Sequence, residues 1–279
     1  MFKILKRENL VPNIHLIKIH APKIANKCKP GQFVIIMPDE KGERIPLSIA
    51  DWDREEGSVT SVFLVVGTST FKLSRLKTGD SVFSFVGPLG KASEIDKFGR
   101  VVCIGGCYGI GAIYPVVKAL KEKGNEVISL IDIRSKYLLY WEDKLKEVSD
   151  ELIVSSRDGS YGFNGYAPEA LKDLIQKKKI DRVIVIGCTY LMFSCSEVTK
   201  PYNIKTMVSL NPIMVDGTGM CGACRVKIGE ETKFACVDGP EFDGHLVDWK
   251  ELFARRKFYF EDEILSLCEW EKNLSEDLK

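Results

Sequence analysis

Four candidate metal ligands stand close together in the segment MVDGTGMCGACRVKIGEETKFAC, residues 214–236, late in the chain. These ligands are Asp216, Cys221, Cys224 and Cys236. Glycines interrupt them at Gly217, Gly219 and Gly222. Glycine lets a chain turn tightly and point successive backbone N–H groups at a small anionic core. This segment therefore has to curl around a compact centre, and the remainder of the chain has to support it.

The spacing of these ligands is D-x4-C-x2-C-x11-C. Plant-type [2Fe–2S] clusters are held by C-x4-C-x2-C and a distant fourth cysteine. An aspartate takes the place of the first cysteine here, and the rest of the pattern is intact. The spacing therefore predicts a [2Fe–2S] cluster held by one carboxylate and three thiolates. The alternatives are a zinc site made by the same four side chains and a disulfide between Cys224 and Cys236.

A β-hairpin is expected between the last two ligands, because RVKI and TKFA flank a short GEE turn. Pairing Ile228 with Thr232 would place Cys224 opposite Cys236. Side chains directly opposite in a hairpin have Cβ atoms about 4.5–5.5 Å apart. Both thiolates would then reach one cluster.

Length and charge narrow the class of protein. The 279 residues, 45% of them hydrophobic, are enough for two ordinary domains and a small appendage. The 40 basic and 39 acidic residues give a net charge of +1, which does not indicate a nucleic-acid partner. We see no signal pattern and no long apolar span, so we expect a cytoplasmic protein that does not enter a membrane. Nine cysteines in such a protein favour metal or redox chemistry over a disulfide framework.

Four parts are expected along the chain, which together give a multi-domain β + α/β fold. Residues 1–98 contain short β-rich runs punctuated by Gly, Pro and Asp, which predicts an antiparallel β-barrel. Residues 99–210 alternate apolar strands with helical segments, which predicts a parallel α/β domain. Residues 211–248 form the small cluster module. Residues 249–279 are expected to be a C-terminal helical tail, with a helix at Asp262–Leu274.

Several short motifs follow one another in a recognisable order. The barrel carries RIPLSIAD at 44–51, VVGTSTFKLSRL at 65–76 and GPLG at 87–90, and the next domain opens with GGCYGIG at 105–111. This order resembles the ferredoxin reductase-type flavoproteins. With the cluster module behind it, the chain is similar to the electron-transfer subunits of dihydroorotate dehydrogenase. It resembles still more closely the small (alpha) subunits of NADH-dependent ferredoxin:NADP oxidoreductases, also called sulfide dehydrogenase beta subunits, in TKPYNIKT, the aspartate ligand and CVDGPEFDGH.

The resemblance covers about residues 1–248 and implies that the barrel binds FAD. From its strand, Ser48 can hydrogen-bond the flavin N5 region. Ser69 and Thr70 lie at a helix start, where free N–H groups favour a pyrophosphate. Arg44 can neutralise that pyrophosphate, although the position of the usual family arginine is Ile45. The predicted FAD-binding residues are Arg44, Pro46, Leu47, Ser48, Ile49, Val65, Val66, Gly67, Ser69 and Thr70.

The second domain is expected to bind NAD(H) or NADP(H) at the carboxyl ends of its strands. GGCYGIG ends a strand and opens a helix, where glycines permit close approach to a dinucleotide phosphate. Asp132 ends the second strand and can bond a ribose hydroxyl, whereas Arg134 and Lys136 suit a 2′-phosphate; we expect NAD(H). By resemblance, Cys188 lies near the nicotinamide, and its alternative is a buried structural thiol. The predicted residues are Gly105, Gly106, Gly109, Ile110, Gly111, Asp132, Arg134, Asp158, Gly159, Gly187 and Cys188.

These features predict an oxidoreductase subunit without a catalytic acid or base. A nicotinamide nucleotide exchanges a hydride with FAD, and FAD exchanges single electrons with the [2Fe–2S] cluster. The resemblance implies a larger iron–sulfur flavoprotein subunit as partner in a heterodimer or larger complex. Through that subunit the chain would serve electron bifurcation among NADH, NADPH and, indirectly, ferredoxin. The alternatives are electron supply to an enzyme such as dihydroorotate dehydrogenase, whose subunit is expected to carry four cysteines, and a zinc-stapled or redox-sensing module without turnover.

Overall fold

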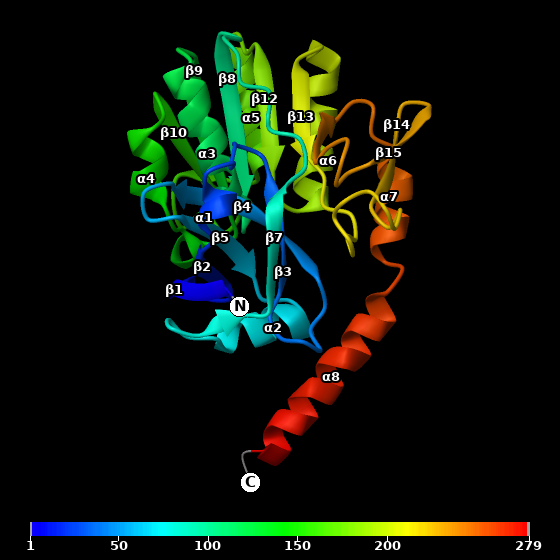
Figure 1. Cartoon of the computed structure of the whole chain (residues 1–279). Coiled ribbons are helices and arrows are strands. Elements are labelled where there is room, and N and C mark those ends of the chain that lie inside the picture. Colours follow the sequence, from blue (N-terminus) through cyan, green and yellow to red (C-terminus); the bar gives the residue numbers. More distant parts are fainter. Residues whose placement is uncertain (1, 278–279) are drawn as a thin grey trace.

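The computed structural model describes residues 2–277, and these form two large sheets, a small hairpin and a set of helices (Figure 1). The first sheet is antiparallel and curls into a nearly closed barrel with the strand order β6-β1-β2-β5-β4-β3-β7. Its strands are β1 (Phe2–Val11), β2 (Ile14–His20), β3 (Phe33–Met37), β4 (Ile45–Asp53), β5 (Ser58–Leu64), β6 (Ser81–Val82) and β7 (Ser84–Leu89). Two short helices accompany it, α1 (Pro22–Ala25) and α2 (Thr68–Arg75).

Strand β4 turns alternate side chains toward the barrel core near its start. Leu47 and Ile49 are buried in that core, whereas Pro46 and Ser48, the residues that directly precede them, are only half-buried. Because successive side chains of a strand point to opposite faces, Pro46 and Ser48 share the face turned away from that core. This face of β4 is therefore free to contribute to a binding site.

The second sheet is parallel except at one edge, and its order is β11-β10-β9-β8-β12-β13-β16. Its strands are β8 (Arg100–Gly106), β9 (Glu126–Ile133), β10 (Glu151–Ser156), β11 (Phe163–Asn164), β12 (Arg182–Ile186), β13 (Lys205–Ser209) and β16 (Glu241–Asp243). Its helices are α3 (Gly109–Glu122), the short helix η1 (Lys136–Leu138), α4 (Glu142–Glu147), α5 (Ala167–Lys177), α6 (Thr189–Thr199) and the short helix η2 (Lys200–Tyr202). The predicted multi-domain β + α/β fold is confirmed.

Helices cover both faces of the parallel sheet. Residues of α3 and α4 belong to one apolar cluster with alternate residues of the central strands, and residues of α5 and α6 belong to the cluster on the other face. The first cluster also contains Ala50 and Val62 from the barrel. A Cβ at Gly111 on α3 would lie only 2.8 Å from a methyl carbon of Val62. Helix α3 is therefore wedged between the two sheets and fixes one against the other.

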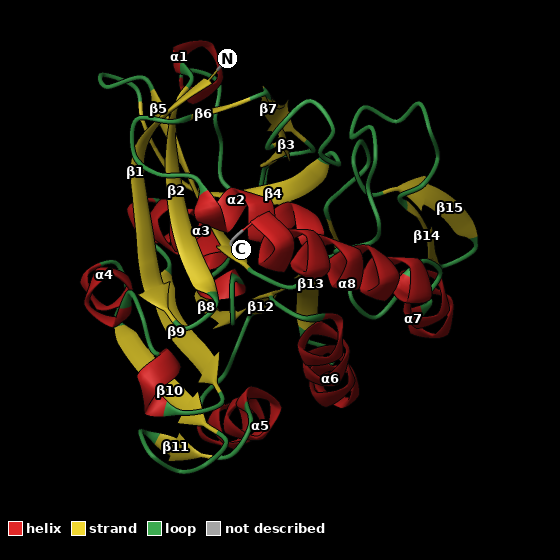
Figure 2. Ribbon diagram, turned by 90° about the horizontal axis from the view of Figure 1, so that it is seen from below, coloured by secondary structure: helices red, strands yellow, loops and turns green. Residues whose placement is uncertain are grey.

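The C-terminal part contains a hairpin of β14 (Arg225–Ile228) and β15 (Glu231–Phe234), followed by α7 (Trp249–Arg256) and α8 (Phe260–Asp277). Strand β16 pairs antiparallel with β13, so the segment after the hairpin is hydrogen-bonded into the parallel sheet. Helix α8 then runs away from the hairpin and crosses beneath the barrel beside α2 (Figures 1 and 2). Among the described residues, no helix is both long and apolar enough to cross a membrane.

Helix α7 lies in the segment 249–279 that was expected to be a helical tail, although no separate helix was predicted at its residues. Its signal was present, because the Asp248 carboxylate accepts a hydrogen bond from Glu251 N at 2.9 Å and caps the helix. Only Trp249 and Leu252 of this helix are buried, so its apolar stripe is short. The helix expected at Asp262–Leu274 is present and longer, as α8.

Candidate functional site

The centre of the cluster loop is a pair of buried thiols. The sulfur atoms of Cys224 and Cys236 lie 3.2 Å apart, and Cys236 N donates to the Cys224 sulfur at 3.4 Å. Burial and the adjacent Cys224 raise the pKa of the Cys236 thiol to about 12. Because a metal binds the thiolate form, these two residues suit a site where a cation replaces the proton.

The hairpin that brings these thiols together has a different register from the one expected. Ile228 pairs with Glu231, and Arg225 pairs with Phe234, so the turn is one residue shorter than predicted. Gly229 in that turn has φ +59°, a conformation that glycine adopts readily. Beyond the ladder, Ala235 N donates to Cys224 O at 3.1 Å. The predicted register was wrong, but the thiols still meet because Cys236 follows Ala235 as an extra residue.

Asp216 is held by its own loop. Its carboxylate accepts hydrogen bonds from Thr218 N at 2.8 Å, from the Thr218 hydroxyl and from Met220 N at 3.5 Å. The Thr218 side chain and these backbone N–H groups hold the pKa of Asp216 below its ordinary value. The carboxylate is thus an anion at neutral pH, and it has to turn from Thr218 to bind iron.

Cys221 is exposed, unlike the other two thiols. Backbone N–H groups of Ala223, Asp216 and Val215 lower the pKa of its thiol, in that order of influence. Within residues 2–277, no three His, Cys, Asp or Glu side chains already converge on one point as a metal site requires. The loop therefore holds one preformed thiol pair, with Cys221 and Asp216 close by on the same loop.

The donor set and the backbone of this loop fit an iron–sulfur cluster. Three thiols and one carboxylate come from a single short segment, and its glycines at 217, 219 and 222 have φ of +84°, +89° and +68°. Two of these glycines are also confined by neighbours: a Cβ at Gly217 would lie 2.7 Å from Ile35, and one at Gly219 would lie 2.5 Å from Val237. The assignment of Asp216, Cys221, Cys224 and Cys236 as ligands stays a prediction.

The cluster loop rests on the barrel. Arg44, at the start of β4, donates from Nε to Val215 O at 3.2 Å and from a terminal guanidinium nitrogen to Asp216 O at 3.1 Å. Its guanidinium therefore binds the cluster loop, and its predicted contact with a pyrophosphate would have to replace or share these bonds. Because Arg44 directly precedes the strand that carries Ser48, the predicted flavin strand and the predicted cluster loop are directly connected.

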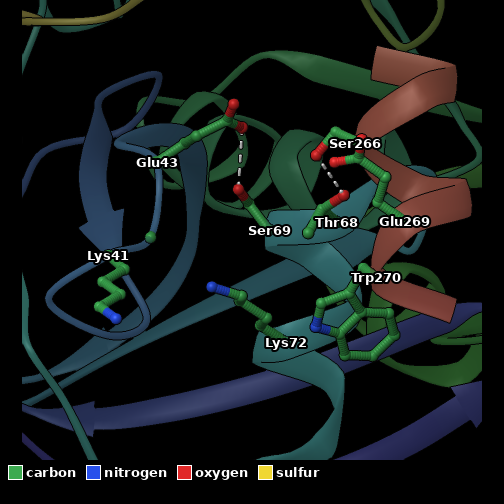
Figure 3. Close-up of a pocket in the computed structure, with 9 residues that line it drawn as sticks. Lys41, Glu43, Thr68, Ser69, Lys72, Ser266, Glu269 and Trp270 are labelled. Atoms are coloured by element: carbon green, nitrogen blue, oxygen red, sulfur yellow. Dashed lines mark hydrogen bonds between the residues drawn. The ribbon is translucent and has the colours of Figure 1, made fainter. Parts of the chain in front are cut away.

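A cleft of about 260 Å³ lies at the amino end of α2, where the sequence predicts the pyrophosphate (Figure 3). The loop with Lys41 and Glu43 forms one wall, and Thr68, Ser69 and Lys72 of α2 form the floor. Gly67, Ser69 and Thr70 are thus at this cleft or directly beside it. Thr70 caps its own helix, since its hydroxyl accepts from Val66 N and Gly67 N at 3.0 and 3.1 Å.

Glu43 lies where an anion is favoured. The Ser69 hydroxyl donates to the Glu43 carboxylate at 3.0 Å at the helix N-terminus (Figure 3). Helix N-termini stabilise negative charge through their free N–H groups and dipole. The Glu43 carboxylate therefore occupies the place predicted for a phosphate oxygen, and a pyrophosphate bound as predicted would have to displace it.

Helix α8 forms the remaining wall of this cleft, with Ser266, Glu269 and Trp270 (Figure 3). Thr68 and Ser266 share a hydrogen bond of 3.0 Å, and the Trp270 ring packs against Phe71 with a centroid distance of 5.5 Å. The sequence analysis did not include these α8 residues in the site. No local motif marks them, because their position follows from the path of the tail beneath the barrel.

The glycine-rich turn 105–111 follows β8 and begins α3, as predicted. A Cβ at Gly109 would lie 2.0 Å from Ile186 O, so this glycine is required for contact between α3 and β12. Cys107 has φ +55°, which is uncommon for a residue other than glycine. The turn is therefore strained and closely packed, and its glycines serve packing whether or not a phosphate approaches.

The acidic residue predicted to bond a ribose is buried and already partnered. The Asp132 carboxylate accepts from Arg157 at 3.1 Å and from Ala167 N at 3.1 Å. Asp158 lies in the exposed loop after β10, where the side chains of Ser135 and Ser160 lower its pKa to about 2. A ribose hydroxyl at Asp132 would thus share the carboxylate with Arg157. Arg134 lies beside it, directly after β9, and Gly159 follows Asp158.

Cys188 is exposed and lies directly after β12, beside Gly187. Its sulfur accepts a hydrogen bond from Leu191 N at 3.4 Å and caps α6. Exposure excludes the alternative of a buried structural thiol. Its position at the carboxyl end of a central strand agrees with the predicted nicotinamide site.

A chain of hydrogen bonds that the sequence did not indicate connects this region to the C-terminal part. Tyr108 OH donates to Gly187 O at 3.0 Å and accepts from Asn211 Nδ2 at 2.7 Å. Asn211 Oδ1 accepts from the Thr189 hydroxyl at 2.9 Å, and that hydroxyl accepts from the Arg256 guanidinium. In this series of hydrogen bonds each hydroxyl donates one bond and accepts another, so all the bonds can form at the same time. Burial raises the pKa of Tyr108 to about 12, so its hydroxyl stays protonated.

A barrel, a parallel α/β domain and a binding region between them define the class of ferredoxin reductase-type folds. A ferredoxin NADP+ reductase from Neisseria gonorrhoeae with bound FAD and NADP shares this fold, with a TM-score of 0.61 at 16% identity over 72% of this chain and 90% of that one. Residues 211–248 match the family described as the iron-sulfur cluster binding domain of dihydroorotate dehydrogenase B.

Two similar chains define the relationship more narrowly. A dihydroorotate dehydrogenase B (NAD(+)) electron transfer subunit homolog from Thermotoga maritima is 46% identical over 95% of this chain and 93% of its own length. A chain from the structure of NADH-dependent reduced ferredoxin-NADP oxidoreductase, studied for flavin-based electron bifurcation, is 44% identical with a TM-score of 0.92 and 98% coverage of both chains. The protein belongs to the family of dihydroorotate dehydrogenase B electron-transfer subunits and their homologues. The predicted relationship and the predicted oxidoreductase class are confirmed.

Proposed function

We propose that this chain is the electron-transfer subunit of an electron-bifurcating NADH/NADPH/ferredoxin oxidoreductase. The cofactors proposed are FAD, a nicotinamide nucleotide and a [2Fe–2S] cluster. Residues 211–248 match an iron-sulfur cluster binding domain, and the similar oxidoreductase is described as NADH-dependent and flavin-based, which supports this set. The observation that carries the proposal is the contact of Arg44, which directly precedes β4, with the backbone of Val215 and Asp216. It connects the strand proposed for flavin with the loop proposed for the cluster, as electron transfer between them requires.

Each part of the chain then has one task. We propose that residues 1–98 bind FAD, residues 99–210 bind the nicotinamide nucleotide, residues 211–248 hold the cluster and residues 249–279 form the tail. Flavin, when bound, supplies the conversion between hydride exchange and single-electron transfer. Ser48 orients the flavin from the free face of β4, Ser69 and Thr70 hold its pyrophosphate at α2, and Asp216 with the three cysteines holds iron. No side chain has to move a proton.

A larger iron–sulfur flavoprotein subunit is the proposed partner. The nine cysteines contain no C-x2-C-x2-C run of the kind that builds [4Fe–4S] clusters. The low-potential path to ferredoxin therefore has to lie outside this chain, and electrons have to leave near the exposed Cys221. NAD(H) is proposed as the nucleotide, because the buried Asp132 is the next-to-last residue of β9, where a carboxylate can accept a hydrogen bond from a ribose hydroxyl.

The purified chain tests this function directly. We expect flavin and iron–sulfur bands in the visible spectrum, bleaching by NADH, and reduction of an artificial acceptor but not of ferredoxin or NADP+. A colourless protein with stoichiometric zinc would refute the enzyme reading. Reduction of ferredoxin by the single chain would refute the subunit reading.

The names of the relatives also favour a second candidate, electron transfer for dihydroorotate dehydrogenase. The two functions differ in the partner. Co-purification from the host followed by assay with dihydroorotate, and separately with NADPH and ferredoxin, distinguishes them.

A further inference from the structure

A second pocket, of about 320 Å³, lies beside the exposed Cys221 and shares no lining residue with the α2 cleft. It opens between the cluster loop and the junction of α7 with α8. Three arginines line it together with two aromatic residues of the junction: Arg225, Arg255, Arg256, Phe258 and Tyr259. Three guanidinium groups in one pocket need an explanation, since the chain as a whole has a net charge of only +1.

The arginines are held in place by neutral groups. Arg225 donates to Gly222 O at 3.1 Å, and Arg255 donates to Ala223 O at 3.1 Å. Arg256 donates to the Thr189 hydroxyl. None of the three forms an ion pair with a carboxylate in the described part of the chain. Because a guanidinium has five N–H donors, most of the donors in this pocket are available to an anion.

The rim of the pocket is apolar and exposed. Of its lining residues, Phe258 is 76% exposed and Tyr259 is 47% exposed. Met220, which directly precedes the lining residue Cys221 in the chain, is 87% exposed. Arginine, aromatic residues and methionine are the residues enriched at protein–protein interfaces. The guanidinium groups alone would suffice to bind a small free anion. The exposed apolar rim therefore indicates a larger, protein ligand.

We propose that this pocket recognises a carboxylate-bearing segment of the partner subunit and seats that subunit over the exposed cluster ligand. This inference rests on the proposed function, which requires electrons to leave the chain at Cys221. Planar guanidinium groups bind carboxylates in a bidentate manner, and charge complementarity speeds association and fixes the orientation of the partners. The three arginines supply the charge, and Phe258, Tyr259 and Met220 supply the apolar contact around it.

A charge-matched pair of triple variants tests the proposal. The test variant is Arg225→Gln/Arg255→Gln/Arg256→Gln. The control is Lys23→Gln/Lys118→Gln/Lys172→Gln, which removes the same charge from exposed residues on α1, α3 and α5. Binding of the co-purified partner subunit is measured with the cofactor-loaded chain at several salt concentrations. We expect the test variant to bind at least about 30-fold more weakly at low salt and to lose most of the salt dependence, and the control to stay within about threefold of wild type.

Iron content and the visible spectrum are measured on each variant, because two of the arginines contact the cluster loop. If the triple variant loses iron, Arg256→Gln alone is used, since Arg256 contacts no cluster-loop backbone; it should weaken partner binding about tenfold. Wild-type partner affinity in an iron-loaded arginine variant overturns the proposal. So does an arginine-dependent binding of inorganic phosphate with unchanged partner affinity, which would assign the pocket to a free anion. A wild-type chain without flavin or iron would instead refute the proposed function itself.

Discussion

Replacing Asn211 with alanine tests whether the hydrogen-bond chain holds the nicotinamide turn or serves only stability. The change removes the acceptor of the Thr189 hydroxyl, at 2.9 Å, and a donor to Tyr108 OH, at 2.7 Å. Thr189 is 1% exposed, so its hydroxyl loses a bond that bulk water does not replace. A buried polar group left unsatisfied costs about 1–3 kcal/mol, which applies to the Thr189 hydroxyl. The lost bond to Tyr108 OH, which keeps Gly187 O as a partner, adds about 1 kcal/mol, so we expect a loss of about 2–4 kcal/mol in all.

The same change should weaken nucleotide binding. Tyr108 lies next to Cys107, whose φ of +55° persists only if the surroundings hold it. Without Asn211, Tyr108 keeps only its bond to Gly187 O, and the turn relaxes. We expect about tenfold weaker binding of NAD+, a loss of about 1.4 kcal/mol, with flavin and iron contents unchanged.

Asn125 provides the matched control for this experiment. It is also buried, accepts from Phe98 N and Gly99 N at 2.7 and 3.1 Å, and donates to Asp96 O and Leu120 O at 2.8 and 2.9 Å. It directly precedes β9, at the amino end of the sheet, far from the nicotinamide turn. Asn125→Ala should lower the free energy of unfolding at least as much and leave NAD+ affinity unchanged.

Thermal unfolding and equilibrium titration with NAD+, and with NADP+ in parallel, give both quantities for each variant. A loss of about 2–4 kcal/mol corresponds to a fall in Tm of roughly 4–16 °C for a chain of this size class. Equal nucleotide affinity in Asn211→Ala and wild type would refute the positioning role. Equal weakening by the two alanine variants would show that affinity follows general stability.

Changes at three further residues, two in the site and one on barrel strand β2, test other parts of the protein. Asp216→Cys should keep a [2Fe–2S] cluster but shift its EPR spectrum and potential, because a thiolate is softer than a carboxylate; an unchanged spectrum in Asp216→Ala would show that the carboxylate is not a ligand. Trp270→Ala should weaken FAD retention about three- to tenfold in equilibrium dialysis, since it removes one wall of the α2 cleft and its contact with Phe71; retention equal to wild type would place the cofactor elsewhere. Burial and the Arg7 charge lower the pKa of His15 to about 4 in the folded protein. Between pH 6.5 and 4 the imidazole is therefore protonated in the unfolded chain but not in the folded one, so the free energy of unfolding falls as the pH falls through that window. His15→Gln should flatten that part of the urea-unfolding profile, and a profile parallel to wild type would contradict the assignment.

The sequence by itself determined the parts that local chemistry specifies. Ligand spacing and interrupting glycines marked 214–236, short β-rich runs punctuated by Gly, Pro and Asp marked the barrel strands, and continuous apolar runs marked the parallel sheet. Each of these signals depends on residues only a few positions apart. The one-residue error in the β14–β15 register has the same origin, because turn length is a weak signal when either of two glutamates can close the turn.

Only the tertiary structure decided which distant residues share a site. Arg44 is more than one hundred and seventy positions from Val215 yet donates to its carbonyl oxygen. Asn211 meets Tyr108 across 103 positions, and Ser266 of the tail meets Thr68 across 198. Such contacts depend on how α3 sets the two sheets against each other and on the path of α8 beneath the barrel. Side chains that meet in this way show no periodicity or fixed spacing in the sequence. Each one contacts a residue that only the folded chain brings near.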